Sequence, residues 1–242
     1  MAGRINCGRS SIQLLGLLRI LGFSSIFKKN MAGIKLIIFD LDGTLIDAYP
    51  AITASFNYAM QRLNYPRQEG QVIRRAVGWG DKGLLSPFVE PRDLTQALSL
   101  YRRHHQKALL GESRLFPQVK KVLRYLKIKG YRLAVASNRP TKFSWILIRH
   151  LGLTKYFDYV LCADALKRAK PHPEILNKIM RRFSLSAEDC LYVGDMVIDA
   201  QAGRGAGIKT VMVTTGSSTE SEIKKEKPWR IIRRVSGLLK IL

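Results

Sequence analysis

The sequence predicts an α/β fold: a doubly wound, mostly parallel sheet (a Rossmann-like core) with a small helical cap inserted after the first strand. Two observations carry this prediction. Short runs of β-branched and aromatic residues alternate with amphipathic helical segments along most of the chain. The stretch that follows the first such run, by contrast, has helical spacing and almost no strand signal. With 46% apolar residues in 242, the chain has enough material for a core of ordinary size.

The first strand and the cap come early in the chain. The run IKLIIF (34–39) is apolar without interruption, which is typical of a strand buried on both faces of a parallel sheet. Apolar residues then recur at helical spacing over 50–64, 68–77 and 93–110, with a loop predicted at Gly78–Gly83. We therefore assign 48–115 to the cap, and 31–47 with 116–242 to the α/β core.

The remaining elements alternate. A helix after Pro117 ends at Gly130, where a glycine suits the left-handed residue that follows a helix. Strands are predicted at 131–136, 157–161, 190–193 and 208–213, with a short one near 229–232. Helices are predicted at 140–151, 173–183 and 197–205, and from 235. Such alternation implies right-handed crossovers, and ligands bind such sheets at the carboxyl ends of the strands.

The first 30 residues differ from the rest. They are apolar with scattered arginine and serine, and Arg19 interrupts a run that is short for a membrane span. A weak signal peptide or an amphipathic surface helix stays open. Because Met31 opens a second plausible start, MAGIKLIIFD, we favour a disordered extension or a start-site artefact for 1–30.

The formal charge of +23 is high, and it is spread along the chain without a block of like charges. Such a surface attracts acidic small molecules, nucleic acids and anionic membranes alike. We find no nucleic-acid recognition motif, so we expect no specific nucleic acid and no stable membrane insertion. The three cysteines form no CxxC pair and give no reason for an oxidising compartment. We expect a cytoplasmic monomer or homodimer.

Polar residues follow the predicted strands. Asp40 and Asp42 come directly after the first strand, and Gly43 allows a sharp turn and the approach of an anion. Ser137 and Asn138 come immediately after the strand 131–136, just before a helix begins. This is an anion-binding arrangement, although such residues also serve as ordinary helix caps.

Two further motifs complete the pattern. Lys170 stands before Pro171 in a stiff segment, and a compact ammonium suits a phosphate. Asp195 follows the strand 190–193, and Asp199 lies one helical turn later. Carboxylates buried at a strand end are costly without a cation, and ligands that are all oxygen favour Mg²⁺ over zinc.

The sequence resembles the haloacid dehalogenase-like superfamily in four motifs that occur in the same order, DLDGT, SN, KP and GDxxxD, and in the helical cap after the first strand. The resemblance covers the chain from Ile34 onward and is strongest to the phosphoglycolate phosphatase group, through the cap segment 77–85 (VGWGDKGLL), SNRP and KPHPEIL. It implies a Mg²⁺-dependent phosphatase that acts on a small phosphorylated metabolite.

By the same resemblance, Asp40 is the nucleophile that forms an aspartyl-phosphate, and Asp42 is the general acid and base. The Mg²⁺ ligands would be the carboxylates of Asp40 and Asp195 and the backbone carbonyl of Asp42, with Asp199 orienting them. Ser137 and Lys170 would hold the phosphoryl oxygens. The second aspartate, Asp42, argues against a dehalogenase.

Substrate contacts are expected from motif residues and from the cap. The candidates are Gly43, Thr44, Asn138, Trp79, Gly80 and Lys82. Trp79 has a plainer interpretation as a packing residue between cap and core. Arg139 and His172 flank the motifs and either reach the substrate or are solvated. His104 and His105 lie on a basic helical face without metal-like spacing and are interpreted as surface residues.

The leading hypothesis is hydrolysis of a phosphomonoester, with 2-phosphoglycolate as the named substrate. A sugar phosphomutase of the β-phosphoglucomutase kind and an inorganic pyrophosphatase remain open, because they share the scaffold. A third hypothesis is an inactive scaffold that docks nucleic acid or anionic membrane through 1–30 and 224–234. Four acidic motif residues argue against it, since an idle site would not need them.

Overall fold

A six-stranded sheet forms the centre of the protein in the computed structural model, which describes residues 33–242. The strands are β1 (Leu36–Phe39), β4 (Arg132–Ser137), β5 (Tyr159–Cys162), β6 (Cys190–Gly194), β7 (Lys209–Val213) and β8 (Arg230–Ile232). Their order is β5-β4-β1-β6-β7-β8, and every neighbouring pair is parallel. The predicted fold class is confirmed.

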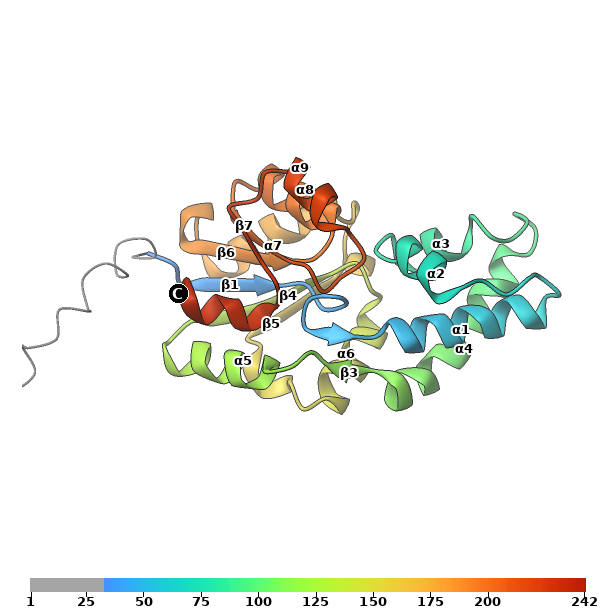
Figure 1. The fold of residues 1–242 in the computed structure, drawn as a ribbon. Helices are drawn as coiled ribbons and strands as arrows, with labels where there is room; N and C mark the ends of the chain where they lie inside the picture. The colour runs from blue at the N-terminus through green and yellow to red at the C-terminus, as the bar shows by residue number, and fades with distance from the viewer. Residues whose placement is uncertain (1–32) are drawn as a thin grey trace, which may run out of the picture. The chain divides into compact units, whose positions relative to one another are not determined.

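Helices cover both faces of the sheet, as the alternating pattern predicts (Figure 1). One face carries α7 (Glu174–Phe183) and α8 (Val197–Gly205), and the other carries α5 (Val119–Ile128) and α6 (Thr141–His150). The apolar stripe of α7, including Ile175, Leu176 and Ile179, packs onto strand residues such as Leu36 and Ile38, all of them buried. These strand and helix side chains build the core.

β1 lies at the point where the strand order reverses. The chain runs from β1 outward to β4 and β5, and then returns to the other side of β1 for β6, β7 and β8. Phe39, the last residue of β1, is in register with Val135 and Val193, and β4 and β6 end within two residues of these positions. Residues just past these positions therefore meet at one edge, where ligands bind in such sheets.

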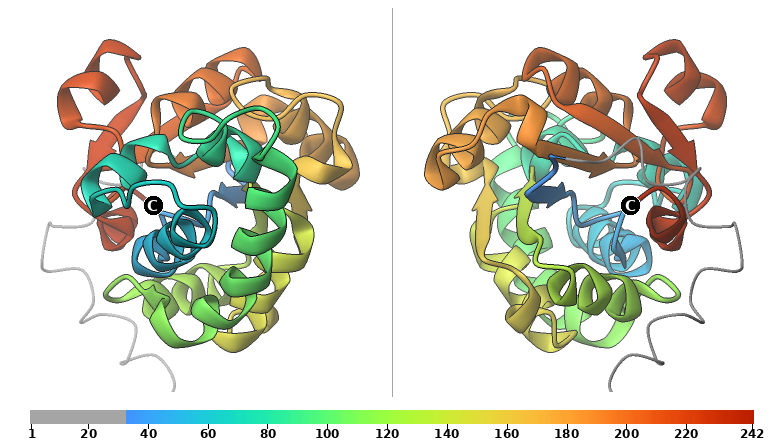
Figure 2. Two further views of the ribbon diagram at one scale, coloured as in Figure 1. Left: turned by 90° about the vertical axis from the view of Figure 1, so that its right-hand side faces the viewer. Right: turned by 90° about the vertical axis from the view of Figure 1, so that its left-hand side faces the viewer.

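The helical segment between β1 and β4 stands beyond that edge of the sheet. It comprises α1 (Tyr49–Arg62), α2 (Gly70–Ala76), α3 (Gly80–Leu85) and α4 (Leu94–Glu112). An antiparallel pair of two-residue strands, β2 (Ile46–Asp47) and β3 (Arg114–Leu115), closes its base. Figure 2 (left) looks onto these helices, which lie in front of the sheet.

The cap helices pack mainly on one another, with α1 against α4 along their length. Two arginines of α2 also reach the core. Arg74 Nη2 donates to the carbonyls of Thr215 and Gly216, at 2.7 and 2.8 Å. Arg75 donates to the Ser217 carbonyl at 2.6 Å and forms an ion pair with Glu222. We call these contacts the α2 clamp.

Two local predictions differ from the structure. The predicted loop Gly78–Gly83 is wrong in its second half, because Gly80–Leu85 forms α3. Its three glycines weaken the helical signal, and burial of Leu84 and Leu85 provides the stabilisation that propensity lacks. The C-terminal helix predicted from 235 is a 3₁₀ segment, Val235–Lys240. The sequence reading also misses α9 (Glu220–Lys225), which Thr219 caps by accepting from the Glu222 N–H.

The expectations for 1–30 lie outside the described residues. Within 33–242, no helix combines the length and the apolar character needed to cross a membrane. Cys162 and Cys190 are both buried free thiols.

Candidate active site

A small cavity lies at the carboxyl edge of the sheet, beneath the cap. Its volume is about 50 Å³. Core and cap both line it, through Asp40, Asp42, Ile52, Val77, Gly78, Gly80, Asp81, Leu84, Tyr101, Ser137, Asn138, Arg139, Lys170, Met196, Ile198 and Asp199. Among the predicted motif residues, Asp40, Asp42, Ser137, Asn138, Lys170 and Asp199 thus meet at one site, and Gly80 joins them from the cap.

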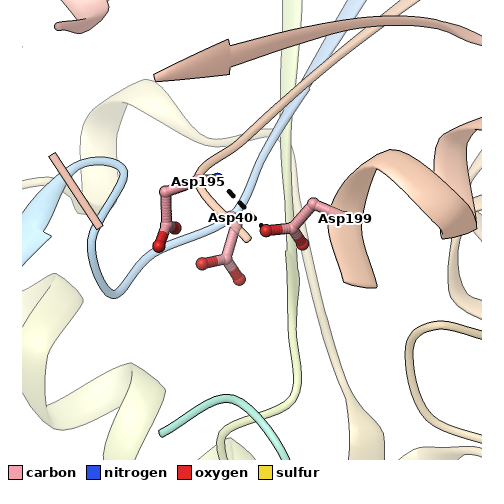
Figure 3. A group of neighbouring side chains, drawn as sticks. All are labelled: Asp40, Asp195 and Asp199. Carbon is pink, nitrogen blue, oxygen red and sulfur yellow. Dashed lines mark hydrogen bonds between the residues drawn. The ribbon is translucent and has the colours of Figure 1, made fainter. Parts of the chain in front are cut away.

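Three carboxylates gather at this edge of the sheet (Figure 3): Asp40 and Asp199 line the cavity, and Asp195 lies next to them without lining it. Asp40, Asp195 and Asp199 each place one oxygen within 4.8 Å of the others, and all three are buried. They come from the ends of β1 and β6 and from the first turn of α8. Burial raises the pKa of Asp40 to about 7, although Lys170 opposes the shift. Burial and the neighbouring carboxylates also raise the pKa of Asp195.

Lys170 is the cation that the cluster already contains. Its Nζ lies 2.7 Å from Asp40 Oδ1 and 2.7 Å from Asp199 Oδ1, and it also donates to the Ala136 carbonyl at 3.0 Å. Burial by itself would lower the pKa of this ammonium, but Asp199 and Asp40 outweigh that effect and raise it. One ammonium against three carboxylates leaves an excess of negative charge.

The surroundings of Asp195 fit a divalent cation. Its Oδ1 accepts from the Thr44 hydroxyl at 2.8 Å, and its Oδ2 lies 3.3 Å from the Ser217 N–H. The hydroxyls of Tyr49 and Ser217 are buried and have no hydrogen-bond partner among the described residues. A set of ligands that are all oxygen and carry excess negative charge suits a hard cation of the Mg²⁺ or Ca²⁺ type.

Asp199 holds its neighbours in place. Its Oδ1 accepts from Lys170 and from the Tyr192 hydroxyl, the latter at 2.6 Å. Its Oδ2 accepts from the N–H groups of Asp195 and Met196, at 3.1 and 2.9 Å. Because both oxygens are engaged, Asp199 fixes the backbone that carries Asp195. Tyr192 has no motif around it, and the sequence reading misses it.

Asp42 faces away from the cluster, toward the cap. Arg139 holds its carboxylate with two hydrogen bonds, from Nε at 2.8 Å and from Nη2 at 2.9 Å. The Arg139 side chain is only 6% exposed. Of the two alternatives left open for this arginine, solvation is excluded. His172, by contrast, does not line the cavity, and its ring accepts from the Glu174 N–H.

The interpretation of His105 as a surface residue is wrong, because the residue is fully buried. It lies where α4 packs against α1, and its Nε2 lies 2.7 Å from Arg139 Nη1. Burial and the nearby Arg139 charge lower the pKa of His105 to about 2, so the ring is neutral. The helical spacing of α4 contains the signal, since His105 shares a face with the buried Tyr101 and Leu109.

The other predicted contacts lie outside the cavity. Thr44 and Gly43 sit behind it, beside Asp195: Thr44 bonds that carboxylate, and a Cβ on Gly43 would come within 2.4 Å of Asp195 Oδ2. Trp79 is 55% exposed and Lys82 is exposed, and neither lines the cavity. The sequence also allows Trp79 to be a packing residue between cap and core, but its side chain is too exposed for that role.

The cap contributes a buried acid that the sequence reading misses. Asp81, in α3, lines the cavity and accepts from Arg102 Nε at 2.9 Å. Asn138 also connects the parts of the site, because its amide donates to the carbonyls of Gly78 in the cap and Lys170 in the core.

The chain is similar to known proteins over most of its length. The family model for haloacid dehalogenase-like hydrolases matches residues 37–213. The phosphoglycolate phosphatase of Haemophilus influenzae is 32% identical over 222 residues, covering 86% of this chain and 98% of its own length. That of Nitrosospira multiformis is 34% identical over 191 residues, covering 76% and 84%.

A solved structure shows the same fold. The crystal structure of a predicted phosphoglycolate phosphatase from Haemophilus somnus 129pt superposes with a TM-score of 0.83 at 30% identity. It covers 88% of this chain and 99% of the other. Together with the matched family model and the curated relatives, this places the protein among the phosphatases, and the chain belongs to the family of haloacid dehalogenase-like hydrolases.

Proposed function

We propose that this phosphatase hydrolyses 2-phosphoglycolate, in a Mg²⁺-dependent reaction that passes through a phosphoaspartate on Asp40. The observation that carries the proposal is the position of the Asp40 carboxylate. It lies at the cavity floor with Oδ1 on Lys170, and with Asp195 and Asp199 next to it. The substrate name comes from the relatives in Haemophilus influenzae and Nitrosospira multiformis.

The residues around Asp195 support the metal. Asp40 and Asp195 would hold Mg²⁺ through their carboxylates and Asp42 through its backbone carbonyl. Asp199 would brace them from behind. When bound, Mg²⁺ supplies positive charge that offsets the phosphoryl oxygens and the carboxylates. Lys170 supplies the second positive charge at the same floor.

In the first step, Asp40 attacks phosphorus, and the bond from phosphorus to the leaving oxygen breaks. Asp42 gives a proton to that oxygen, so the alcohol leaves neutral. In the second step, Asp42 takes a proton from the water that attacks phosphorus, and the Asp40–phosphorus bond breaks to release phosphate. In the structure, two hydrogen bonds from Arg139 hold the Asp42 carboxylate in one orientation.

Ser137 and Lys170 would position the phosphoryl group. The Ser137 side chain is buried at the cavity and accepts from the Arg139 N–H at 3.2 Å. Its own O–H finds no acceptor among residues 33–242, so a phosphoryl oxygen could accept from it. The segment 48–115 would act as a cap that covers the cavity and excludes water from the reaction.

Phosphate release from a panel of monoesters tests the proposal. The panel contains 2-phosphoglycolate, sugar phosphates and pyrophosphate, with Mg²⁺ or with EDTA. We expect Mg²⁺-dependent turnover that prefers 2-phosphoglycolate and that Asp40→Asn abolishes. Preference for a sugar phosphate or for pyrophosphate would refute the substrate. Turnover that survives Asp40→Asn would refute the mechanism.

A further inference from the structure

Arg139 has hydrogen-bonding capacity that its role toward Asp42 does not use. A guanidinium carries five N–H donors. The described structure engages three: Nε and one donor of Nη2 bind Asp42, and one donor of Nη1 binds His105. One N–H on each terminal nitrogen is left without a partner among residues 33–242.

The contact with His105 is well defined. Arg139 can only donate, so His105 Nε2 accepts and Nδ1 carries the proton. Ser55 Oγ donates to the Ala51 carbonyl at 2.7 Å and lies 3.1 Å from Nδ1 of both His105 and His104, so it can accept the His105 N–H. The guanidinium is therefore fixed between Asp42 of the core and His105 of the cap.

Free donors on a buried cation favour an anionic partner. An unused donor costs free energy when it is removed from water, and the Arg139 side chain is only 6% exposed. Two N–H groups on adjacent terminal nitrogens match the two oxygens of a carboxylate, which guanidinium groups bind in a forked geometry.

Of the cations that line the cavity, Arg139 is the one with donors free to bind a carboxylate. The cationic residues of the cavity lining are Lys170 and Arg139. Lys170 is committed to Asp40, Asp199 and the Ala136 carbonyl. The acid on the cap side, Asp81, is paired with Arg102, so its charge is offset.

The position of Arg139 relative to the reaction follows from the proposed function, on which this inference rests. Asp42 must reach the leaving oxygen in order to protonate it. Arg139 binds Asp42 directly, so its remaining donors lie next to the first carbons of the leaving alcohol. A carboxylate attached to the carbon that bears the leaving oxygen would be within their reach.

We propose that Arg139 determines the substrate class of this enzyme. Its two free donors bind a carboxylate on the carbon that carries the phosphate ester, and the enzyme thereby selects small 2-phosphocarboxylates over neutral phosphomonoesters. The cap takes part through His105, which fixes the guanidinium when the cavity is covered.

The test compares two substrates that differ only at this group, 2-phosphoglycolate and ethyl phosphate, in which a methyl replaces the carboxylate. The measured quantity is the ratio of their kcat/KM values. We expect a ratio well above one for the wild type, and a fall of about tenfold or more in Arg139→Gln, as for loss of a charged hydrogen bond. Arg139→Lys should retain part of the preference, because it keeps the charge without the fork.

Arg149→Gln is the control, since Arg149 is exposed on α6, the helix that begins two residues after Arg139, and its ratio should equal that of the wild type. An Arg139→Gln ratio equal to that of the wild type would overturn the proposal and reduce Arg139 to a residue that positions Asp42. A wild-type ratio near one would overturn it as well. Absence of turnover of both esters by the wild type would instead refute the proposed function.

A measurement on the wild type alone keeps the proposal testable if the variants do not fold. Glycolate should inhibit hydrolysis of p-nitrophenyl phosphate competitively and at lower concentration than glycolamide, its neutral counterpart. Equal inhibition by the two compounds would contradict a carboxylate subsite at Arg139.

Discussion

At the scale of single residues, the site depends on backbone that approaches Asp195 closely. Gly216 has no Cβ, and one placed there would lie 1.6 Å from Asp195 Oδ2. Gly43 faces the same carboxylate from another loop. These glycines leave room for Asp195 in a position where its oxygens can face a cation.

Gly216→Ala should therefore weaken Mg²⁺ binding, because Asp195 must move. We expect a loss of about 10- to 100-fold in Mg²⁺ affinity, typical of changes around metal ligands. Calorimetric titration of Mg²⁺ measures it. Gly111→Ala is the control, since a Cβ there meets nothing within 4 Å in an exposed part of α4, and it should leave the affinity unchanged. Equal affinities of Gly216→Ala and the wild type would contradict this reading of the loop.

His105 gives a prediction about pH. Its pKa is lowered from 6.5 to about 2 in the folded state, so below pH 6.5 the unfolded chain binds a proton that the folded protein does not. Stability is therefore lost as the pH falls below 6.5, by up to about 1.4 kcal/mol per pH unit from this one group. In urea unfolding between pH 7.5 and 5, His105→Gln should lose less stability over this range than the wild type. Identical slopes would show that His105 is not buried in its neutral form.

Only part of the site leaves a signal in the local sequence. Asp40, Asp42 and Asp195 come just after strand ends, and Lys170 and Asp199 stand in short recognisable motifs, so the sequence predicts all five as site residues. Arg139, His105 and Tyr192 carry equally specific contacts but have no motif, and their partners are distant in the sequence. A buried polar side chain is recognised by its partner, which only the folded chain supplies.

At the scale of elements, the α2 clamp connects the cap to the loop 215–217, which contacts Asp195. Arg74 holds two carbonyls of the loop that also contains Ser217, whose N–H contacts Asp195. Its guanidinium also lies 4.1 Å from the centre of the Tyr49 ring at the base of the cap. The clamp therefore connects the cap helices, which cover the cavity, to the loop that positions Asp195.

Arg74→Gln should weaken the attachment of the cap to the core. We expect kcat/KM to fall by roughly tenfold, in line with the loss of hydrogen bonds from a charged donor, with a smaller change in thermal unfolding. Steady-state kinetics with the preferred substrate measures it. Arg103→Gln, at an exposed position of α4, is the control and should behave as the wild type. An Arg74→Gln enzyme with unchanged kcat/KM would show that the clamp does not contribute to catalysis.

Most elements could be predicted, because their signal is local. The run LIIF is apolar at every position and forms β1, buried along its length. The errors concern segments in which tertiary contacts decide. α3 forms despite its glycines because Leu84 and Leu85 are buried, and the two-residue strands β2 and β3 are too short to leave a periodic pattern.

At the scale of the whole molecule, the sheet topology brings the motifs together. β1 lies between β4 and β6, so residues 40, 137 and 195 emerge at one edge although they are far apart in the sequence. The rule for parallel sheets predicts this meeting. It does not predict how the cap closes over the edge, because that arrangement depends on side-chain contacts such as Arg139 with His105.

The side chains that line the cavity carry a net negative charge. Four aspartates line it together with two cations, so a dianionic phosphate needs further positive charge. Removal of divalent metal should therefore weaken binding of inorganic phosphate strongly, by tenfold or more. Calorimetry with and without EDTA checks this, and equal affinities would contradict a metal contribution to anion binding.

The central claim is that Asp40 takes the phosphoryl group, and trapping of the intermediate tests it most directly. Enzyme is mixed with 2-phosphoglycolate and Mg²⁺, quenched in acid during turnover and reduced with borohydride, which converts an acyl phosphate of aspartate to homoserine. Peptide mass spectrometry then locates the change. We predict homoserine at position 40, dependent on substrate and metal. Label at another residue, or rapid turnover that leaves Asp40 unmodified under conditions that trap a reference phosphoaspartate, would contradict a phosphoaspartate at Asp40.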